Sequence, residues 1–241
     1  MSIAFGYPFY GQTTGVLVFE NIAPRIPGDA GHAGSFSYPV CYEVISGGFA
    51  DLVEGSPQIR HAILDGGKRL VDRGIRAILG DCGMMSLYQD CMGAVLGVLF
   101  AGSSLCQIPM IWQLLGRQGT IGVITGHSGL LGIKHLLHSG WSEEIPICIQ
   151  GMETEAHFRE IVIEGGLSLR PEQMEQDVLS AGKKLREKCP ALRAVVLECS
   201  NLASYSAALA KELKIPVFDT MSAANMMHYA VEPAVYGVEP A

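Results

Sequence analysis

Arg76-Ala-Ile-Leu-Gly-Asp-Cys82-Gly is the stretch that decides the fold, because Arg193-Ala-Val-Val-Leu-Glu-Cys199-Ser repeats its order later in the chain. Each stretch is a short apolar run that ends in an acidic residue and a cysteine, and a helical pattern follows each one. The two cysteines lie about half a chain length apart. The repeat therefore predicts two similar halves, each with a cysteine at the end of a strand.

Strand-like runs alternate with longer helical patterns on both sides of this repeat. Such alternation indicates parallel strands joined by crossover helices. Continuous apolar runs such as residues 194–197 are typical of sheets that are covered on both faces. The predicted strands are residues 15–19, 40–45, 76–79, 109–112, 120–125, 146–150, 194–197 and 216–218. The predicted helices lie near residues 56–73, 86–103, 128–138, 153–164, 171–188, 202–213 and 219–230.

The eight predicted strands divide into two sets of four, with a break near residues 114–119. We therefore expect an α/β fold of two similar doubly wound domains, each with a roughly four-stranded parallel sheet, related by pseudo-twofold symmetry. The first domain would be residues 1–114 plus 219–241, whose helix returns to pack on the first half, and the second residues 115–218. Ligands bind at the carboxyl ends of the strands of open α/β sheets. Both cysteines are therefore expected at one cleft.

Composition excludes several classes of function. Apolar residues make up 49% of the 241-residue chain, which allows a substantial core, and the net charge of −7 disfavours binding to nucleic acid or to an acidic membrane surface. Residues 1–15 contain no Lys or Arg and no continuous apolar segment, so no signal peptide is expected. The most apolar stretch, residues 92–105, is too short to span a bilayer. We expect a cytoplasmic protein with a small-molecule substrate. Whether it forms a homo-oligomer is left open.

Cys82 and Cys199 differ in context from the other five cysteines. The seven cysteines include no C-x-x-C pair, so no metal site is expected. Most should be reduced, buried and small apolar groups. Each of these two, however, follows an acidic residue and precedes a helix start, whose N–H groups can stabilise a thiolate or hold a carboxylate. A packed thiol remains the alternative for either cysteine taken alone.

A pair of thiols suits the inversion of a stereocentre next to a carboxylate. This reaction removes a proton from one face of a carbon and delivers one to the other face. A thiolate and a thiol of similar proton affinity can exchange these roles for the two directions. Neighbouring groups can move the pKa of a cysteine toward neutrality. The developing enolate-like charge also needs hydrogen-bond donors in a site from which water is excluded.

The Asp81-Cys82-Gly83 and Glu198-Cys199-Ser200-Asn201 segments resemble the paired cysteine motifs of the aspartate/glutamate/hydantoin racemase superfamily. The resemblance covers nearly the whole chain in strand order and cysteine placement. It implies two similar α/β domains with the active site between them, no metal and no organic cofactor. It also implies that Cys82 and Cys199 are the two acid/base residues.

The resemblance further implies substrate-binding residues after each cysteine. Ser200 and Asn201 match the small polar residues that hold the substrate carboxylate in amino-acid racemases, although either could instead cap the next helix. After Cys82 the sequence departs from this pattern, since Gly83, Met84 and Met85 leave backbone N–H groups and Ser86 to bind an anion. This departure favours a less polar substrate or a different mode of binding.

Two further strand ends carry candidate substrate-binding residues. Asn21 follows the first strand, and Arg25 lies in the long loop after it, residues 20–39, where its planar guanidinium could bind a distal carboxylate or lie at the surface. Thr125 ends the first strand of the second half. His127, which follows, is expected to tune a thiolate, to contact the substrate or to cap a helix.

These features predict a racemase or epimerase of a small carboxylate-bearing molecule, with aspartate or glutamate as the first candidates. Hydantoin racemisation and a maleate-isomerase-like reaction with one nucleophilic cysteine remain alternatives. Arylmalonate decarboxylation is disfavoured, because in the family it goes with a single active-site cysteine. The alternative from another class is a binding protein that has kept the cleft and lost the chemistry.

Overall fold

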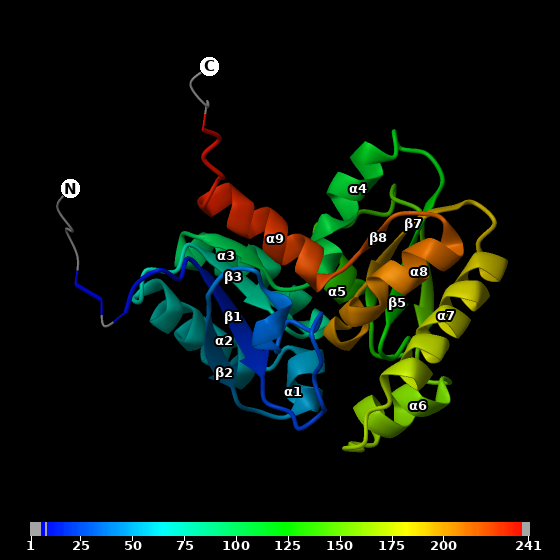
Figure 1. Cartoon of the computed structure of the whole chain (residues 1–241), viewed down its shortest axis with the longest axis horizontal. Coiled ribbons are helices and arrows are strands. Elements are labelled where there is room, and N and C mark those ends of the chain that lie inside the picture. The colour runs from blue at the N-terminus through cyan, green and yellow to red at the C-terminus, as the bar shows by residue number, and fades with distance from the viewer. Residues whose placement is uncertain (1–5, 8, 238–241) are drawn as a thin grey trace.

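The protein contains two four-stranded parallel sheets, as the sequence predicts (Figure 1). A computed structural model describes residues 6–7 and 9–237. The strand order is β2-β1-β3-β4 in the first sheet and β6-β5-β7-β8 in the second, so each half repeats the same topology. The strands are β1 (Thr14–Phe19), β2 (Val40–Ile45), β3 (Ala77–Gly80), β4 (Leu99–Ala101), β5 (Thr120–Thr125), β6 (Ile147–Gly151), β7 (Leu192–Leu197) and β8 (Val217–Phe218).

Helices connect these strands and cover both faces of each sheet. The α-helices are α1 (Phe49–Glu54), α2 (Pro57–Val71), α3 (Gln89–Leu96), α4 (Ile108–Leu114), α5 (Ile133–His138), α6 (Ala156–Phe158), α7 (Pro171–Lys188), α8 (Ser206–Leu213) and α9 (Thr220–Val231). Shorter 3₁₀ helices are η1 (Ala33–Ser35), η2 (Gly83–Tyr88), η3 (Ser104–Gln107) and η5 (Ser200–Tyr205), and η4 (Arg159–Ile163) is a π-helical turn.

Alternate residues of the first sheet face two different helical layers. Leu17 and Ile78 belong to a core cluster that also includes Ile63 and Leu70 of α2. Their neighbours along the strands, among them Val16 and Ala77, belong to a separate cluster with α9. This is the alternation that a parallel sheet requires when both faces are buried.

The C-terminal helix α9 follows the second sheet but packs on the first. It contacts β1, β3 and β4, and Figure 1 shows it lying across the first half. Its buried residues are Thr220, Ala223, Ala224 and Met227. Small side chains allow the helix to lie close to the sheet, which contributes Ala77 and Ala101 at this contact. The boundaries proposed for the two domains remain a prediction.

The second sheet joins the two halves through one of its faces. Ile121, Val123 and Val196 belong to the same buried cluster as Leu17 and Ile78 of the first sheet. The other face packs against α7 and α8 in a cluster of its own. The turn between the two sheets contains positive φ angles at Gly116, Arg117 and Gly119. The halves are thus linked by a continuous core as well as by the chain.

The predicted strand at residues 109–112 is wrong, because this segment is helix α4. Pro109 lies in the first turn of that helix, where its missing N–H costs nothing. The fourth strand is instead Leu99–Ala101, which lies within the predicted helix 86–103. The predicted helix 86–103 is too long because Gly97 adopts a left-handed conformation, with φ of 66°, which ends α3 at Leu96.

Other helical segments are shorter or less regular than predicted. Residues 86–88 and 202–205 lie in 3₁₀ helices that precede α3 and α8. The predicted helix 128–138 begins at Ile133, after a turn in which the N–H groups of Leu130 and Leu131 bond to the carbonyl of His127. The predicted helix 153–164 is one short α-helix and a π-helical turn. Helix α1 had no counterpart in the prediction, whereas α7 has the predicted bounds.

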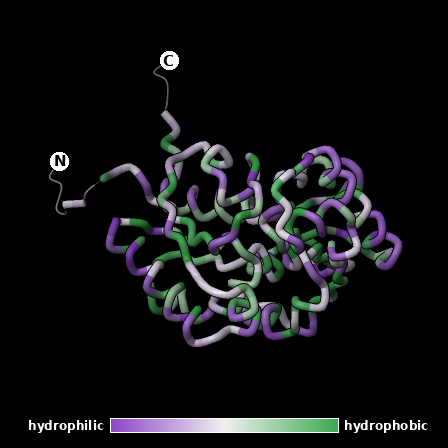
Figure 2. Tube along the Cα trace, turned by 90° about the horizontal axis from the view of Figure 1, so that it is seen from below, coloured by the Kyte–Doolittle hydropathy of each residue, from purple (hydrophilic) through white to green (hydrophobic). Residues whose placement is uncertain are grey.

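The distribution of hydropathy follows this architecture (Figure 2). The strands of both halves are rich in hydrophobic residues, and hydrophilic residues lie mainly on the outer helices and turns. Within the described residues, no helix combines the length and the apolar character that a bilayer-spanning helix needs.

Candidate active site

The two repeat segments form the same local structure in both halves. Strand β3 leads through Asp81 to Cys82, which precedes η2 and then α3. Strand β7 leads through Glu198 to Cys199, which precedes η5 and then α8. Both cysteines have extended backbone angles at the start of a six-residue 3₁₀ helix. The strand–acid–cysteine–helix order of the sequence is therefore a structural repeat.

The two cysteines line one cavity of about 480 Å³ between the halves. The cavity lies at the carboxyl ends of the strands, where its lining comes from the last residue of β1 and from the residues that directly follow β1, β3, β5 and β7. Aromatic and aliphatic side chains line much of it. The lining residues are Phe19, Glu20, Asn21, Ile22, Ala23, Arg25, Gly47, Phe49, Asp81, Cys82, Gly83, Met84, Gly126, His127, Leu130, Phe158, Ile161, Val162, Ile163, Gly165, Glu198, Cys199, Ser200 and Asn201.

Asp81 is a buried carboxylate that joins strand β1 to the loop after it. Its Oδ1 accepts a hydrogen bond from the Phe19 N–H at 2.7 Å, and its Oδ2 accepts one from Arg25 Nη2 at 2.6 Å. Burial raises the pKa of Asp81 to about 6, although Arg25 and the Phe19 N–H act in the opposite direction. The residue beside Cys82 thus titrates close to neutrality.

Glu198 occupies the equivalent position in the second half. Its Oε2 accepts a hydrogen bond from Thr125 Oγ1 at 2.7 Å, and the Gly126 N–H also bonds to the carboxylate. Burial raises the pKa of Glu198 to about 7 against these two hydrogen bonds. The carboxylate also lies against Gly83, where a Cβ atom would overlap it. The glycine after Cys82 therefore makes room for an acidic side chain from the other half.

Arg25 and Asn201 meet at Asp29, a buried residue of the 20–39 loop. Arg25 Nη1 donates to Asp29 Oδ1 at 2.6 Å, and Asn201 Nδ2 donates to Asp29 Oδ2 at 2.7 Å. Because Arg25 is also paired with Asp81, its guanidinium bridges two carboxylates of the protein. Arg25 lines the cavity, but its charge is already balanced by these two carboxylates, and its contact with a substrate stays a prediction.

The remaining predicted residues differ in their surroundings. Asn21 lines the cavity, but its side chain is engaged in a turn with Phe19 O and Ala23 N. His127 also lines it, with Nδ1 accepting from the Gly129 N–H at 3.1 Å. Thr125 is fully buried behind the cavity as the hydroxyl partner of Glu198. Gly83, Met84 and Ser200 line the cavity next to the cysteines. Contact of any of these residues with a substrate remains a prediction.

Burial and neighbouring carboxylates favour the protonated form of both thiols. Burial raises the pKa of Cys82 well above its usual value, and the carboxylates of Asp81 and Glu198 raise it further. Burial also raises the pKa of Cys199, with Glu198 adding to the effect. Backbone N–H groups of Met84 and Asn201 partly offset these shifts. A thiolate in this cavity therefore requires a compensating positive charge.

Several lining residues were not singled out from the sequence. Asp81 and Glu198 were noticed as neighbours of the cysteines but not as groups of the site itself. The aromatic residues Phe49 and Phe158 carry no motif, since only the fold brings them to the cavity. Asp29 does not line the cavity but binds Arg25 and Asn201, which do. The position of Asp81 and Glu198 one residue beyond a strand end is a signal that could have found them.

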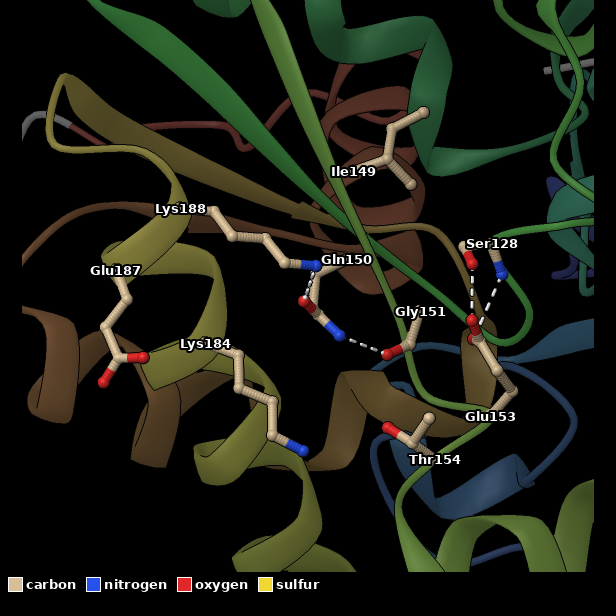
Figure 3. A pocket seen from close by; sticks show the side chains of 9 residues that line it. All are labelled: Ser128, Ile149, Gln150, Gly151, Glu153, Thr154, Lys184, Glu187 and Lys188. Atoms are coloured by element: carbon tan, nitrogen blue, oxygen red, sulfur yellow. Dashed lines mark hydrogen bonds between the residues drawn. The ribbon is translucent and has the colours of Figure 1, made fainter.

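A second cavity of about 550 Å³ lies at the end of β6, away from the cysteines (Figure 3). Its polar side chains largely bond to one another. Lys188 Nζ donates to Gln150 Oε1, and Ser128 bonds to Glu153. Lys184 Nζ donates to Glu155 Oε1 at 2.6 Å. No thiol lines this cavity. The cysteine cavity is therefore the candidate active site.

Among residues 6–7 and 9–237, no group of three or more His, Cys, Asp or Glu side chains could hold a metal ion. The reactive and polar groups of the cysteine cavity include two thiols, two buried carboxylates and the backbone N–H groups after each cysteine. These groups can accept, donate and stabilise a proton at a small bound molecule. Together with two doubly wound halves, they define a paired-cysteine α/β protein.

Known proteins share this fold, and others are similar to the chain in sequence at less than 30% identity. No family model matches the chain. It is 27% identical over 222 residues to dimethylsulfoniopropionate lyase 7 of Emiliania huxleyi, which covers 88% of this chain and 64% of that protein. It is 24% identical over 209 residues to dimethylsulfoniopropionate lyase of Durusdinium sp. clade D, covering 83% and 68%. The chain thus spans about two thirds of the length of these relatives.

Solved structures with the same fold include a decarboxylase and racemases. Unliganded arylmalonate decarboxylase superposes with a TM-score of 0.61 at 13% identity, covering 95% of this chain and 97% of that one. Allantoin racemase from Klebsiella pneumoniae gives a TM-score of 0.55 at 15% identity, covering 91% and 88%. The chain has the aspartate/glutamate racemase-like fold.

Proposed function

We propose that the cysteine cavity removes a proton from the carbon next to a carboxylate, and that the substrate is a sulfonium carboxylate of the dimethylsulfoniopropionate type. The product-forming step would be a β-elimination, which makes the protein a lyase. The observation that carries the proposal is the charge of the cavity that contains both cysteines. Similarity in sequence to dimethylsulfoniopropionate lyases supports the same substrate.

The charge of the cavity favours a substrate that carries a cation. Among the described residues that line it, Glu20, Asp81 and Glu198 are acidic, and Arg25 is the one Lys or Arg side chain. Arg25 already pairs with Asp29 and Asp81. A second carboxylate, as in aspartate or glutamate, would meet acidic groups without a free cation. A sulfonium zwitterion has no net charge and brings the positive charge that the cavity lacks.

The apolar wall of the cavity also suits a methylated cation. Phe19 and Phe49 contact edge to face, with ring centroids 6.3 Å apart, and both line the cavity together with Phe158. Aromatic faces attract cations that lack strongly hydrated hydrogen-bond donors. The substrate carboxylate would bind the first backbone N–H groups of η2 and η5, which have no partner within their helices. The sulfonium would then lie near the aromatic rings and carboxylates.

The reaction needs one base. A thiolate takes the proton from the carbon next to the carboxylate, and that electron pair forms the carbon–carbon double bond. The carbon–sulfur bond breaks with its electron pair going to sulfur, which leaves as neutral dimethyl sulfide, and the other product is acrylate. The proton on the cysteine then returns to solvent. A bound sulfonium would favour the thiolate, which burial and the neighbouring carboxylates disfavour.

Racemisation is the second candidate, because the cavity contains two cysteines where the elimination uses one base. Solved racemases with this fold support it. In that reaction both thiols would take part, one as base and the other as acid. A substrate such as an amino acid or a hydantoin would then exchange its proton with solvent without losing a group.

The experiment is to incubate the purified chain with dimethylsulfoniopropionate and to measure dimethyl sulfide by headspace gas chromatography and acrylate by NMR. The two products are expected in equal amounts, and Cys82→Ser is expected to form neither. Absence of both products at millimolar substrate would reject the lyase. Deuterium exchange from D₂O into a panel of amino acids and hydantoins would in that case establish the racemase. A covalent adduct in the intact mass spectrum would indicate the maleate-isomerase-like alternative.

A further inference from the structure

A continuous set of polar contacts connects the two cysteine motifs through the 20–39 loop. Asp81, beside Cys82, binds Arg25, and Arg25 binds Asp29. Asp29 in turn binds the side-chain amide of Asn201, whose Oδ1 lies 3.6 Å from Cys199 Sγ. The path begins at a motif of the first half and ends at the sulfur of the second.

The Asn201 amide can adopt one orientation in this set. The Asp29 carboxylate accepts hydrogen bonds from Arg25 Nη1, from the Gly31 N–H and from Asn201, at 2.6 to 2.7 Å. A carboxylate with these partners is an acceptor, so the group of Asn201 that faces it must be the amide NH₂. The carbonyl oxygen Oδ1 must then face Cys199 Sγ. Asn201 therefore offers the sulfur an acceptor, which a thiol can use and a thiolate cannot.

Cys82 lacks such an acceptor from the residue two positions after it. Its equivalent of Asn201 is Met84, which contributes a backbone N–H to the sulfur and an apolar side chain to the cavity. Cys199 receives the corresponding N–H from the Asn201 backbone, but also faces the Asn201 oxygen. The internal repeat is thus broken at a position whose side chain acts on the protonation of one sulfur, in addition to the carboxylates of Asp81 and Glu198, which favour the thiol form of Cys82, and of Glu198, which favours that of Cys199.

The charged and titratable groups around Cys199 come from three directions. Glu198 precedes it in the chain, just after β7, Asp29 and Arg25 act on it from the 20–39 loop, and Cys82 acts on it from the other cysteine motif. His127, from the end of β5, lines the same cavity. Glu198 and Asp29 favour the thiol and Arg25 the thiolate. A test of Asn201 must therefore distinguish the effect of its side-chain oxygen on the Cys199 thiol from the effect of the negative charge of Asp29.

We infer that Arg25 and Asp29 are positioning residues, which fix the Asn201 amide so that Cys199 is held as a proton-donating thiol, and that Cys82 is the cysteine that supplies the thiolate. The role of Cys82 as base rests on the proposed function. The state of the Cys199 thiol does not, because it can be measured without a substrate. The two cysteines are therefore unequal despite the repeat.

The experiment follows alkylation of each cysteine by iodoacetamide against pH, with peptide mapping by mass spectrometry. Asp29→Asn allows the side-chain amide of Asn201 to rotate by half a turn, because an amide at position 29 can donate a hydrogen bond to Asn201 Oδ1. The NH₂ group of Asn201 then faces the sulfur and stabilises a thiolate. Alkylation of Cys199 at pH 8 should become faster by on the order of tenfold, as a pKa lower by about one unit gives. Alkylation of Cys82 should not become faster.

The double variant separates amide reversal from the loss of charge. In an Asn201→Ala background, Asp29→Asn removes the same negative charge, but there is no Asn201 amide to rotate. Asp29→Asn should therefore accelerate the alkylation of Cys199 several-fold less in this background than in the otherwise unmutated chain. Equal acceleration in both backgrounds would overturn the inference, as would equal acceleration of both cysteines. If Asp29→Asn does not fold, Asn201→Ala alone tests the point, because it removes the acceptor and should accelerate Cys199 and not Cys82.

Turnover measurements test the unequal roles of the two cysteines independently. With dimethylsulfoniopropionate, Cys82→Ser should lose at least on the order of 100-fold in kcat, whereas Cys199→Ser, whose hydroxyl still donates a hydrogen bond, should retain a clearly larger fraction. Equal loss in both would overturn the assignment of unequal roles. Absence of turnover in the unmutated chain would reject the proposed function and leave the alkylation result to decide the state of Cys199.

Discussion

At the scale of single residues, the site depends on two carboxylates placed one residue before two cysteines. Asp81 and Glu198 each bond to the end of the neighbouring strand, through the Phe19 N–H in one half and through Thr125 and Gly126 in the other. Both are buried, so their ionisation is costly. They shape the charge of the cavity and link its protonation to the stability of the fold.

Replacing Glu198 with Gln should flatten the pH dependence of stability. The pKa of Glu198 rises from 4.5 to about 7 on folding, so the folded state binds more protons between these pH values. Stability from this group is therefore present at low pH and is lost as the pH rises toward 7 and above. Urea unfolding from pH 5 to 8.5 should show the wild type losing stability relative to Glu198→Gln. Parallel curves for the two proteins would contradict the shift.

At the scale of elements, the position of α9 depends on small side chains. Ala223 and Ala224 are fully buried and pack with Val16, Ala77 and neighbouring residues of the first sheet. There is little space for a larger group at such a contact, because protein interiors are close-packed. The C-terminal helix is thus held by the shape of its inner face.

Ala224→Leu should destabilise the protein by about 1–3 kcal/mol through overpacking. For a chain of this size, the melting temperature should fall by roughly 2–4 °C for each kcal/mol. Differential scanning calorimetry measures the change. Met226→Leu is the matched control, since Met226 lies on the same helix but is exposed. An unchanged melting temperature for Ala224→Leu would show that α9 is free to move away from the sheet.

The elements also show where sequence reasoning succeeds and where it fails. Buried strands such as β5 and the long helix α7 follow from apolar runs and from helical periodicity, and their bounds were predicted to the residue. The fourth strand was missed because Leu99–Ala101 is short and continues the apolar pattern of α3. The cysteines were placed by a repeat in the sequence. The aromatic wall was not, because long-range packing brings it to the cavity. The contact of Asp29 with Asn201 was missed for the same reason.

At the scale of the whole molecule, the two halves share one core. A face of the second sheet belongs to the same buried cluster as the first sheet, and Trp112 and Trp141 pack against it. Ser104 Oγ, just after β4, donates to the Leu197 carbonyl of β7 at 2.7 Å. Neither half can separate without exposing apolar surface to water.

Unfolding should therefore be a single cooperative transition. Tryptophan fluorescence reports on the shared cluster, and far-ultraviolet circular dichroism reports on the helices of both halves. The two transitions in urea should coincide, as they do when no intermediate is populated. Two separated transitions would show that one half unfolds while the other remains folded, and would contradict the shared core.

The contact between Glu198 and Gly83 makes the two sides of the cavity different. A serine or threonine after Cys82 would need the space that the Glu198 carboxylate already fills. The small polar residue that follows the cysteine is therefore present in one half, as Ser200, and is excluded from the other. The two cysteines therefore have different groups beside them, the Glu198 carboxylate against Gly83 in one motif and the Ser200 side chain in the other. A fold built from two similar halves thus encloses a cavity whose two sides are not equivalent.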